Sequence, residues 1–325
     1  MYTIECLKGL PYEFESFLIQ KYDSYITTCK YLEVFGKNHD FYYFPIYDDD
    51  KLEDLLVFGN DGNMSKCFNS LVAINQNIVS KCVRILFEKF PFVEKIHIAL
   101  SYTSYNFKKG ILCPTSETYI LNLPATLDEY FLLLGPTTRK NLKRYKSKFL
   151  REFPRANYVE KTGAEIEEWM VSSIIQLNID RMLYKGIVPG KVQNDINDYY
   201  LFSKHYGCIT YIEIDGEIVG GDISYLINKN IYGHVIAFNN QYQKYNLGHI
   251  CILHAIQNSI EKKMSYYNLL TGSNEYKSKL AAKPHVTYSY LIYRDFCLRF
   301  FADKYKMKIE QYIVQLRFSK YSKPT

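Results

Sequence analysis

The segment from residue 208 to residue 238 constrains the fold of this chain more than any other. Two strand-like runs, 208–214 and 217–227, are joined by Asp215-Gly216. An Asp-Gly pair between two such runs is a strong signal for a type I′ turn, in which both central residues have positive φ. A third run, Ile231–Phe238, follows after a short polar turn. We therefore expect a hairpin followed by a third strand.

The flanking residues add helices before and after these strands. Upstream, Thr162 and Glu165 match a capping box, and the helix it starts would carry Trp169 and Ile174 on its inward face. Downstream, apolar periodicity predicts a helix at 247–263, a strand at 265–270, a short helix at 276–282, a strand at 286–294 and an amphipathic helix at 297–316. This order of elements predicts an α/β fold with a mixed sheet.

The first hundred residues have a similar order of elements. They contain predicted strands at 41–47, 52–58 and 93–100 and a helix at 78–90. The chain has 325 residues, which is enough for two sizeable cores. We therefore expect a duplicated architecture with one boundary near residue 120, which gives the halves 1–120 and 121–325.

Charge and cysteine usage limit the classes of partner. The net charge of +6 would attract an anionic ligand but is too small to indicate nucleic acid. The eight cysteines show neither CxxC spacing nor zinc-ligand spacing with histidines, so we expect no metal site and a reducing compartment. The sequence shows no signal-peptide pattern and no apolar run of transmembrane length. We expect a cytoplasmic protein, and the oligomeric state stays open.

The loop after Phe238 leads directly from the third strand into the next helix. The start of a helix presents unpaired N–H groups and the positive end of the helix dipole, which suits a phosphate or pyrophosphate. Asn246 and Gly248 suit a left-handed backbone and a close approach of backbone to ligand. The alternative interpretation is that the loop needs these residues only to turn the chain.

Three segments resemble the GNAT superfamily of acyltransferases, and its CelD-type and FemAB-like branch in particular. The run Gln243–Gly248 is similar to the pyrophosphate loop Q/R-x-x-G-x-G/A, with Asn246 in place of the first glycine. Tyr267–Lys277 is similar to the branch's "dfl.G…YK" signature, and Leu123–Arg144 to its "LP…eYl…Rknlrr" segment. The resemblance implies a GNAT fold, with two GNAT-like halves in tandem, of which the first lacks a donor site.

The resemblance also implies a mechanism. Acetyl-CoA or another acyl-CoA would be the donor, with its pantetheine arm between the splayed strands 231–238 and 265–270. A backbone N–H near Ala237 or Phe238 would polarise the thioester carbonyl. The amine of a small acceptor would attack directly. The implied donor-binding residues are Ala237, Phe238, Gln243, Asn246, Leu247, Gly248 and His249.

Candidates for proton transfer and acceptor binding come from the matched motif and from strand ends. The resemblance makes Tyr276 the candidate acid for the departing thiolate. Glu213, Asp222 and Glu275 are candidates for the base that takes a proton from the attacking ammonium group, and the alternative for each is an exposed carboxylate without a catalytic role. Asn274 and Lys277 are candidate contacts to the acceptor.

A basic helix is predicted upstream of the capping box. Seven basic residues and no acid lie between Arg139 and Arg151. At 100° per residue, Arg139 and Lys146 fall on the apolar side, while the outward set points away from it: Lys140, Arg144 and Arg151. A charge on an apolar side must extend to solvent, find a partner or face a cleft. We expect Arg139 to contact an anion of the cofactor or of the acceptor, and the alternative is a solvated basic face or an RNA contact.

Three functions compete at this point. The first is transfer of an acyl group from acyl-CoA to the amine of an amino sugar, amino acid or similar acceptor, in surface polysaccharide or lipid biosynthesis. The second is FemAB-like aminoacyl transfer from charged tRNA to a peptidoglycan precursor. The third is a GNAT fold kept as a non-catalytic binding module. Asn246 and the lack of a clear base favour the third.

Overall fold

The computed structural model describes residues 2–190, 195–272 and 275–321, and the chain folds as two compact units. Unit 1 consists of Met1–Glu117 and Val286–Thr325, and unit 2 consists of Thr118–His285. The sequence predicted a single division, with 286–325 in the second half. The structure groups these residues with the N-terminal segment because β14 (Lys283–Tyr293) pairs with β6 (Lys95–Ser101).

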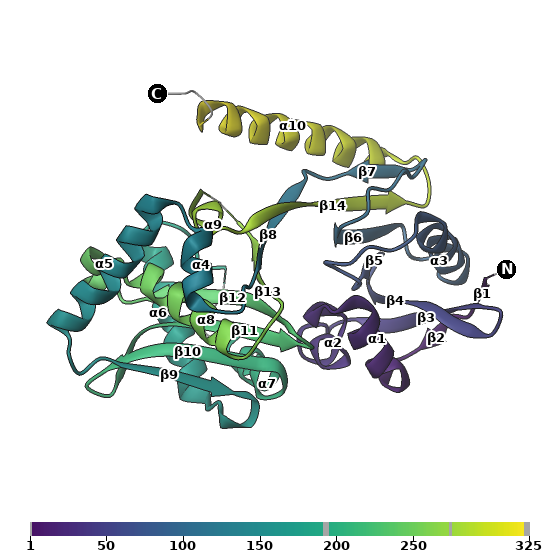
Figure 1. Ribbon diagram of the computed structural model, residues 1–325. Coiled ribbons are helices and arrows are strands. Elements are labelled where there is room, and N and C mark those ends of the chain that lie inside the picture. The colour runs from purple at the N-terminus through teal and green to yellow at the C-terminus, as the bar shows by residue number, and fades with distance from the viewer. Residues whose placement is uncertain (1, 191–194, 273–274, 322–325) are drawn as a thin grey trace. The chain divides into compact units, whose positions relative to one another are not determined.

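Unit 1 is built on a sheet of order β1-β3-β4-β5-β6-β14, in which β5 and β6 are parallel and joined by α3. The short strands β2 and β7 pair with β3 and β14. The remaining elements are β1 (Thr3–Ile4), β2 (Leu7–Lys8), α1 (Glu15–Tyr22), α2 (Cys29–Phe35), β3 (Asp40–Asp48), β4 (Lys51–Asp61), β5 (Met64–Cys67), α3 (Gln76–Lys89), β7 (Gly110–Leu112) and α10 (Leu298–Tyr321) (Figure 1).

The core of unit 1 forms between its helices and its sheet. The predicted apolar stripe of α3 is confirmed, since Ile78, Val79, Cys82 and Leu86 are buried. They belong to one cluster with Leu18 of α1 and other residues of the sheet and helices.

Unit 2 contains a sheet of order β8-β13-β12-β11-β10-β9, in which β12 and β13 are parallel and joined by α8. The predicted hairpin is confirmed, because Asp215 and Gly216 have φ of 52° and 86°. The elements are β8 (Ser116–Asn122), α4 (Leu127–Leu133), α5 (Pro136–Glu152), β9 (Asn157–Thr162), α6 (Glu168–Tyr184), α7 (Ile196–Tyr206), β10 (Gly207–Ile214), β11 (Glu217–Ile227), β12 (Asn230–Phe238), α8 (Leu247–Glu261), β13 (Tyr266–Thr271) and α9 (Glu275–Lys279).

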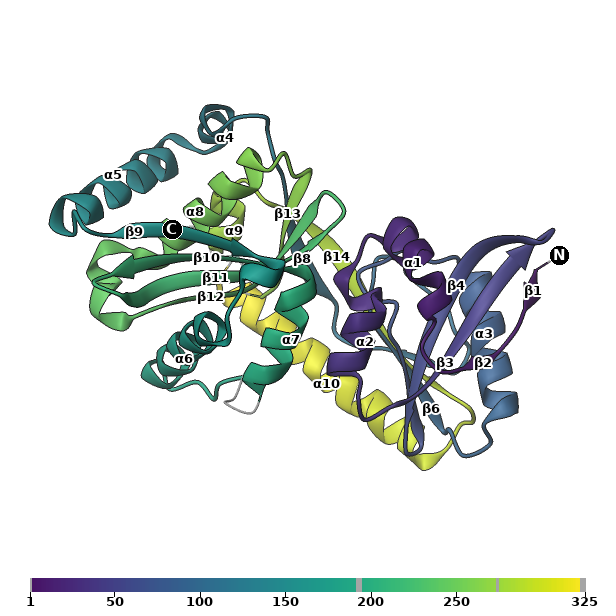
Figure 2. The same cartoon turned by 90° about the horizontal axis from the view of Figure 1, so that it is seen from below.

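Helices α6 and α8 cover opposite faces of the sheet of unit 2. A Cβ built on Gly221 would meet Ile174 of α6, whereas one built on its neighbour Gly220 would meet Cys251 and Leu247 of α8. Because successive residues of a strand point to opposite faces, the two helices lie on different sides. Figure 2 shows the same arrangement, with α6 and α7 on one side of β10–β12 and α8 on the other.

The start of α6 differs from the prediction. The capping box of Thr162 and Glu165 forms, but it closes a single 3-10 turn, and α6 begins at Glu168. Trp169 therefore lies in the first turn of α6 and is 43% exposed. Its ring lies 6.2 Å from that of Tyr211 on β10, and its indole N–H donates to the Glu167 carboxylate at 3.2 Å. No helix within the described ranges is long and apolar enough to cross a membrane.

Candidate functional site

The parallel strands β12 and β13 pair over their first three residues and then separate. Their register runs from Asn230 opposite Tyr266 to Tyr232 opposite Asn268. Beyond these pairs, β12 continues to Phe238 with β11 as its partner, and β13 continues to Thr271 with β8. The two strands therefore splay and leave an opening at the point where α8 begins.

A tyrosine fixes the closed end of this opening. Tyr267 belongs to β13, but its hydroxyl donates to Asp222 at 3.1 Å and lies 2.8 Å from the Ser224 hydroxyl, both on β11. The ring must cross β12 to reach them, and Gly233 provides the space, since a Cβ there would lie 2.6 Å from the ring. Asp222 is completely buried in this network and does not line the opening.

A lysine shapes the other wall. The Lys277 ammonium group donates to the carbonyl oxygens of Leu269, Leu270 and Thr271, each at 2.9 Å. Leu270 has a left-handed backbone with φ of 53°, and its N–H donates to the side chain of Asn268. The lysine thus holds the irregular end of β13 where it leaves β12. Burial lowers the pKa of Lys277 to about 8.

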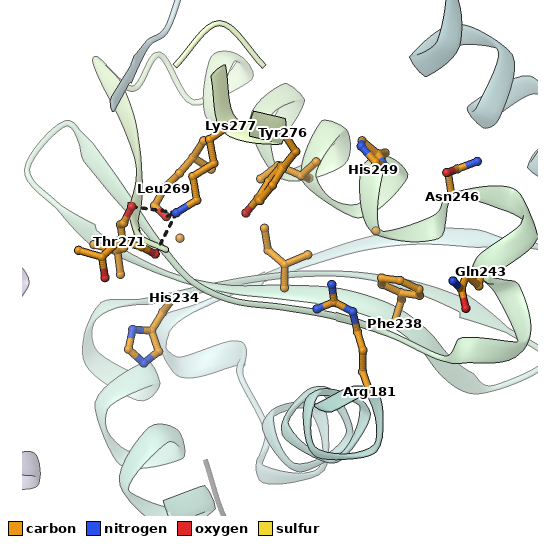
Figure 3. Close-up of a pocket in the computed structure, with 15 residues that line it drawn as sticks. Arg181, His234, Phe238, Gln243, Asn246, His249, Leu269, Thr271, Tyr276 and Lys277 are labelled. Atoms are coloured by element: carbon orange, nitrogen blue, oxygen red, sulfur yellow. Dashed lines mark hydrogen bonds between the residues drawn. The ribbon is translucent and has the colours of Figure 1, made fainter. Parts of the chain in front are cut away.

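The opening between the separated strands forms a cavity of about 450 Å³ (Figure 3). Its charged or titratable lining side chains are Arg181, His234, His249, Tyr276 and Lys277. No carboxylate is present among the lining residues that the structure describes. The cavity is therefore basic, and an anionic ligand suits it. Among the described residues, no group of three or more His, Cys, Asp or Glu side chains could hold a metal ion.

The start of α8 forms one end of the cavity. Asn246 has φ of 58°, so the left-handed backbone that the loop was expected to need is present. The N–H groups of His249 and Ile250 donate to the Asn246 carbonyl oxygen. Those of Leu247 and Gly248 have no acceptor in the described part of the chain. This helix start can therefore accept an anion.

Gly248 has a packing role that the sequence interpretation did not include. A Cβ at this position would lie 2.7 Å from the ring of Phe238. The absence of a side chain is therefore explained by the contact with Phe238, and the glycine alone does not indicate a phosphate site. Gln243, Asn246 and His249 line the same end of the cavity.

The backbone of β12 supplies amide groups to the opening. The N–H of Asn239 donates to the carbonyl oxygen of Val219 on β11. Because antiparallel pairing alternates, the N–H of Ala237 also faces β11, opposite Gly221. The N–H of Phe238 then faces the other side, where β13 has separated. Of the two positions predicted for a carbonyl-polarising amide, the geometry favours Phe238.

Tyr276 and His249 lie between the main cavity and a second cavity. Both also line this second cavity, of about 160 Å³, against α5. Figure 3 shows the Tyr276 hydroxyl pointing into the main cavity. Burial raises the pKa of Tyr276, so its hydroxyl stays protonated at neutral pH. Burial lowers the pKa of His249 below 6.5, with Lys279 acting in the same direction, so its imidazole is neutral.

Arg181 is a cavity residue that sequence reasoning missed. It extends from α6 into the cavity (Figure 3), and its guanidinium carbon lies 4.9 Å from the centre of the Phe238 ring. Its Nε is buried without a hydrogen-bond partner, an arrangement that costs about 1–3 kcal/mol when no ligand satisfies it. The only sequence signal is a lone basic residue near the end of an amphipathic helix, and this signal is not specific.

The remaining predicted residues lie elsewhere. Glu213 is on β10 opposite Asn157 and Ile218 and is not a lining residue of the cavity. Arg139 donates to the carbonyl oxygens of Leu132 and Leu134 and so caps the end of α4. Asn274 lies outside the described residues. The structure therefore gathers Phe238, the loop 243–249, Tyr276 and Lys277 and leaves Glu213, Asp222 and Arg139 apart.

In the described part of unit 1, no such opening separates the parallel strands β5 and β6. After β5 the chain stays bonded to the chain at the end of β6, because the N–H of Leu71 donates to Leu100 and that of Tyr102 donates to Val72. The first unit repeats the order of elements but keeps this region closed.

Comparison with known proteins supports the fold. Residues 201–278 match a family model described as an acetyltransferase (GNAT) domain. This span contains β10–β13, α8 and most of the cavity lining. No curated protein matches the sequence. The matched domain indicates an acyltransferase-like protein.

Solved structures are similar over most of the chain despite low sequence identity. FemX is 8% identical, with a TM-score of 0.61 over 87% of this chain and 96% of its own. L-PGS from Bacillus licheniformis is 13% identical, with a TM-score of 0.58 over 96% and 98%. A conserved protein of unknown function from Bacteroides thetaiotaomicron is 10% identical, with a TM-score of 0.56 over 90% and 100%. The predicted α/β GNAT fold with a mixed sheet is confirmed, and the CelD-type part of the resemblance stays a prediction.

Proposed function

We propose that unit 2 transfers an acyl group from acetyl-CoA or another acyl-CoA to the amine of a small acceptor. The observation that carries this proposal is the cavity between the splayed ends of β12 and β13. It brings together a helix start with free N–H groups, a strand amide that faces the opening and a protonated tyrosine. An acyl-CoA donor needs a site for its pyrophosphate, a donor to its thioester carbonyl oxygen and an acid for its leaving thiolate, and these three groups would supply them.

The residues of the cavity would act one after another in the attack of the amine on the thioester. The donor's pyrophosphate would lie at the N–H groups of Leu247 and Gly248. The N–H of Phe238 would stabilise the negative charge on the thioester oxygen as the amine nitrogen bonds to the carbonyl carbon. The carbon–sulfur bond then breaks, and Tyr276 would give its proton to the leaving thiolate.

The attacking amine must lose a proton, and the described lining offers only imidazoles for this step. His249 is neutral at physiological pH because burial lowers its pKa, so it can accept a proton. It also stands at the boundary of the two cavities, beside Tyr276. We propose His249 in place of Glu213 and Asp222, neither of which lines the cavity.

The similarity to FemX keeps aminoacyl transfer from tRNA as a second candidate. The basic helix α5 is the surface that would favour it, because Lys140, Arg144 and Arg151 are exposed as expected. Binding to tRNA would weaken steeply as salt is raised, whereas a buried CoA site would respond less. Titration of both ligands at two salt concentrations therefore separates the two proposals.

Calorimetry with acetyl-CoA and a longer acyl-CoA tests the donor assignment. The sharpest variant is Gln243→Glu, which adds a negative charge beside the start of α8 without a change of shape. We expect acyl-CoA to bind about 10-fold more weakly, because the new carboxylate repels the pyrophosphate. The matched control is Gln241→Glu, an exposed position in the same loop that does not line the cavity. Equal affinity in both variants would place the donor elsewhere.

A further inference from the structure

We propose that Arg181 binds an oxyanion of the acceptor, a carboxylate or a phosphate, so that the substrate is an amine that also carries a negative group. This inference rests on the proposed function and adds the chemical class of the acceptor. Its basis is a guanidinium group that reaches into the cavity from α6.

The hydrogen-bonding capacity of Arg181 is unused. A guanidinium group has five N–H donors, and in the described structure none of them donates to a protein acceptor, while Nε is shielded from solvent. The contact with the Phe238 ring, 4.9 Å away, holds the group without satisfying its donors. An arginine that is oriented and unpaired in this way is ready for a planar anion.

The other charges of the cavity do not compete for that anion. Lys277 already directs its three N–H donors at three backbone carbonyl oxygens. The described lining contains no carboxylate that could pair with Arg181. Lys185, one turn further along α6, adds a second positive charge near it. Arg181 is therefore the cation of the described lining that can receive an external oxyanion.

The helix that carries Arg181 favours the acceptor as the source of the anion. Because the guanidinium group and Gly248 at the start of α8 both lie against the Phe238 ring, the binding measurement below must separate this anion from the donor's pyrophosphate. Arg181 extends from α6, whereas the helix start proposed for the pyrophosphate belongs to α8. These two helices cover opposite faces of the sheet. Figure 3 shows Arg181 rising from one side of the strands and His249 and Asn246 on the other. With the pyrophosphate at the start of α8, the acceptor amine would lie in the cavity near His249 and Tyr276, and its anionic group would extend toward Arg181 on the α6 side.

Paired acceptors test the proposal directly. Acetyl transfer from acetyl-CoA is measured to glucosamine 6-phosphate against glucosamine, and to an amino acid against its amide. We expect the anionic member of at least one pair to have the higher kcat/KM, and Arg181→Met to lower that value about 10- to 100-fold. The exposed Arg155→Met, whose side chain makes a surface ion pair with Asp215, is the control with the same change of charge. Equal kcat/KM within both pairs, or an unchanged preference in Arg181→Met, would refute the inference.

A binding measurement keeps the test independent of catalysis. Inorganic phosphate is titrated into the whole protein with and without acetyl-CoA, and we expect Arg181→Met to weaken phosphate binding while the affinity for acetyl-CoA stays within about twofold. Saturating acetyl-CoA occupies the proposed pyrophosphate site, so the decisive titration is the one in its presence. If phosphate binding there does not depend on Arg181, or if Arg181→Met loses acetyl-CoA binding, the inference is wrong. If no acetyl group is transferred but Arg181-dependent phosphate binding persists, the proposed function fails and the anion site remains.

Discussion

At the residue scale, the environment of Asp222 explains why a polar side chain in a buried strand need not be catalytic. Its carboxylate accepts hydrogen bonds from Ser224 and Tyr267, and both donors lie in the same buried layer. The group anchors the ring that crosses β12 at the closed end of the opening. Asp222 thus positions the site without touching a substrate.

Asp222→Asn should make the stability of unit 2 less dependent on pH. Burial raises the pKa of Asp222 from 3.8 to about 7. Between these values the folded state holds a proton that the unfolded state has lost, so stability falls as pH rises through this range and stays low above it. We expect the variant to be more stable than the wild type near about pH 8, by on the order of 1–3 kcal/mol. Urea unfolding followed by the fluorescence of Trp169, the single tryptophan, measures this in unit 2. A steeper pH dependence in the variant would contradict the assignment.

Tyr276→Phe should slow acyl transfer while the donor still binds. The hydroxyl is the proton source proposed for the thiolate, so its loss should lower kcat about 10- to 100-fold. The dissociation constant of acetyl-CoA should change by less than about twofold, because the proposed pyrophosphate contacts are backbone groups of α8. Tyr184→Phe, at a position 70% exposed on α6, is the control. Full kcat in Tyr276→Phe would remove the tyrosine from the mechanism.

At the scale of elements, local chemistry made part of the site predictable. Asp215-Gly216 and Asn246 take the positive φ that their residue types favour. The helix that contains Leu247 and the strands beside it follow from apolar periodicity. The opening itself was not derivable from periodicity or spacing and entered only through the family resemblance. It depends on where Lys277 finds its acceptors and on how Tyr267 crosses β12, and both are tertiary contacts.

Lys277→Met should destabilise unit 2 and disturb the wall of the cavity. The substitution leaves three backbone carbonyl oxygens without their charged donor, which should cost about 3 kcal/mol in the free energy of unfolding. Lys279→Met is the matched control, two residues away, where an exposed ion pair with Glu275 is worth less than about 1 kcal/mol. Denaturant unfolding monitored at Trp169 compares the two. Similar losses in both variants would show that the carbonyl contacts do not hold the end of β13.

At the scale of the whole molecule, sequence order could not predict that β14 pairs with a strand of unit 1. The prediction assumed that each half of the chain supplies its own sheet. Instead, Tyr290 and Ile292 of β14 are part of the core formed by the N-terminal residues. Nothing local distinguishes a strand that pairs with a neighbour in sequence from one that pairs with β6, almost 200 residues earlier. The duplicated architecture was predictable, but the membership of its last strand was not.

The pairing of β14 with β6 predicts how removal of the C-terminal residues should affect the stability of each unit. A chain that ends at His285 lacks most of β14, so β6 loses its neighbour on that side and presents an open edge. The core cluster that α1 and α3 share with the sheet also loses Tyr290 and Ile292. We expect unit 1 to unfold or aggregate, while unit 2 keeps a cooperative transition at Trp169 because all strands from β8 to β13 remain. A chain that ends at Arg294 keeps β14 and removes α10, so it separates the effect of the strand from that of the helix.

Limited proteolysis of the two truncated chains decides between the observed units and a simple division near residue 120. If residues 286–325 belong energetically to unit 1, ending the chain at His285 should expose the N-terminal 117 residues to rapid cleavage and leave unit 2 protected. Under a simple division, the same truncation would damage the second half and spare the first, and the fluorescence transition of Trp169 would move instead. Acetyl-CoA binding by the protected unit 2 would then show that the cavity needs only the strands and helices that form it.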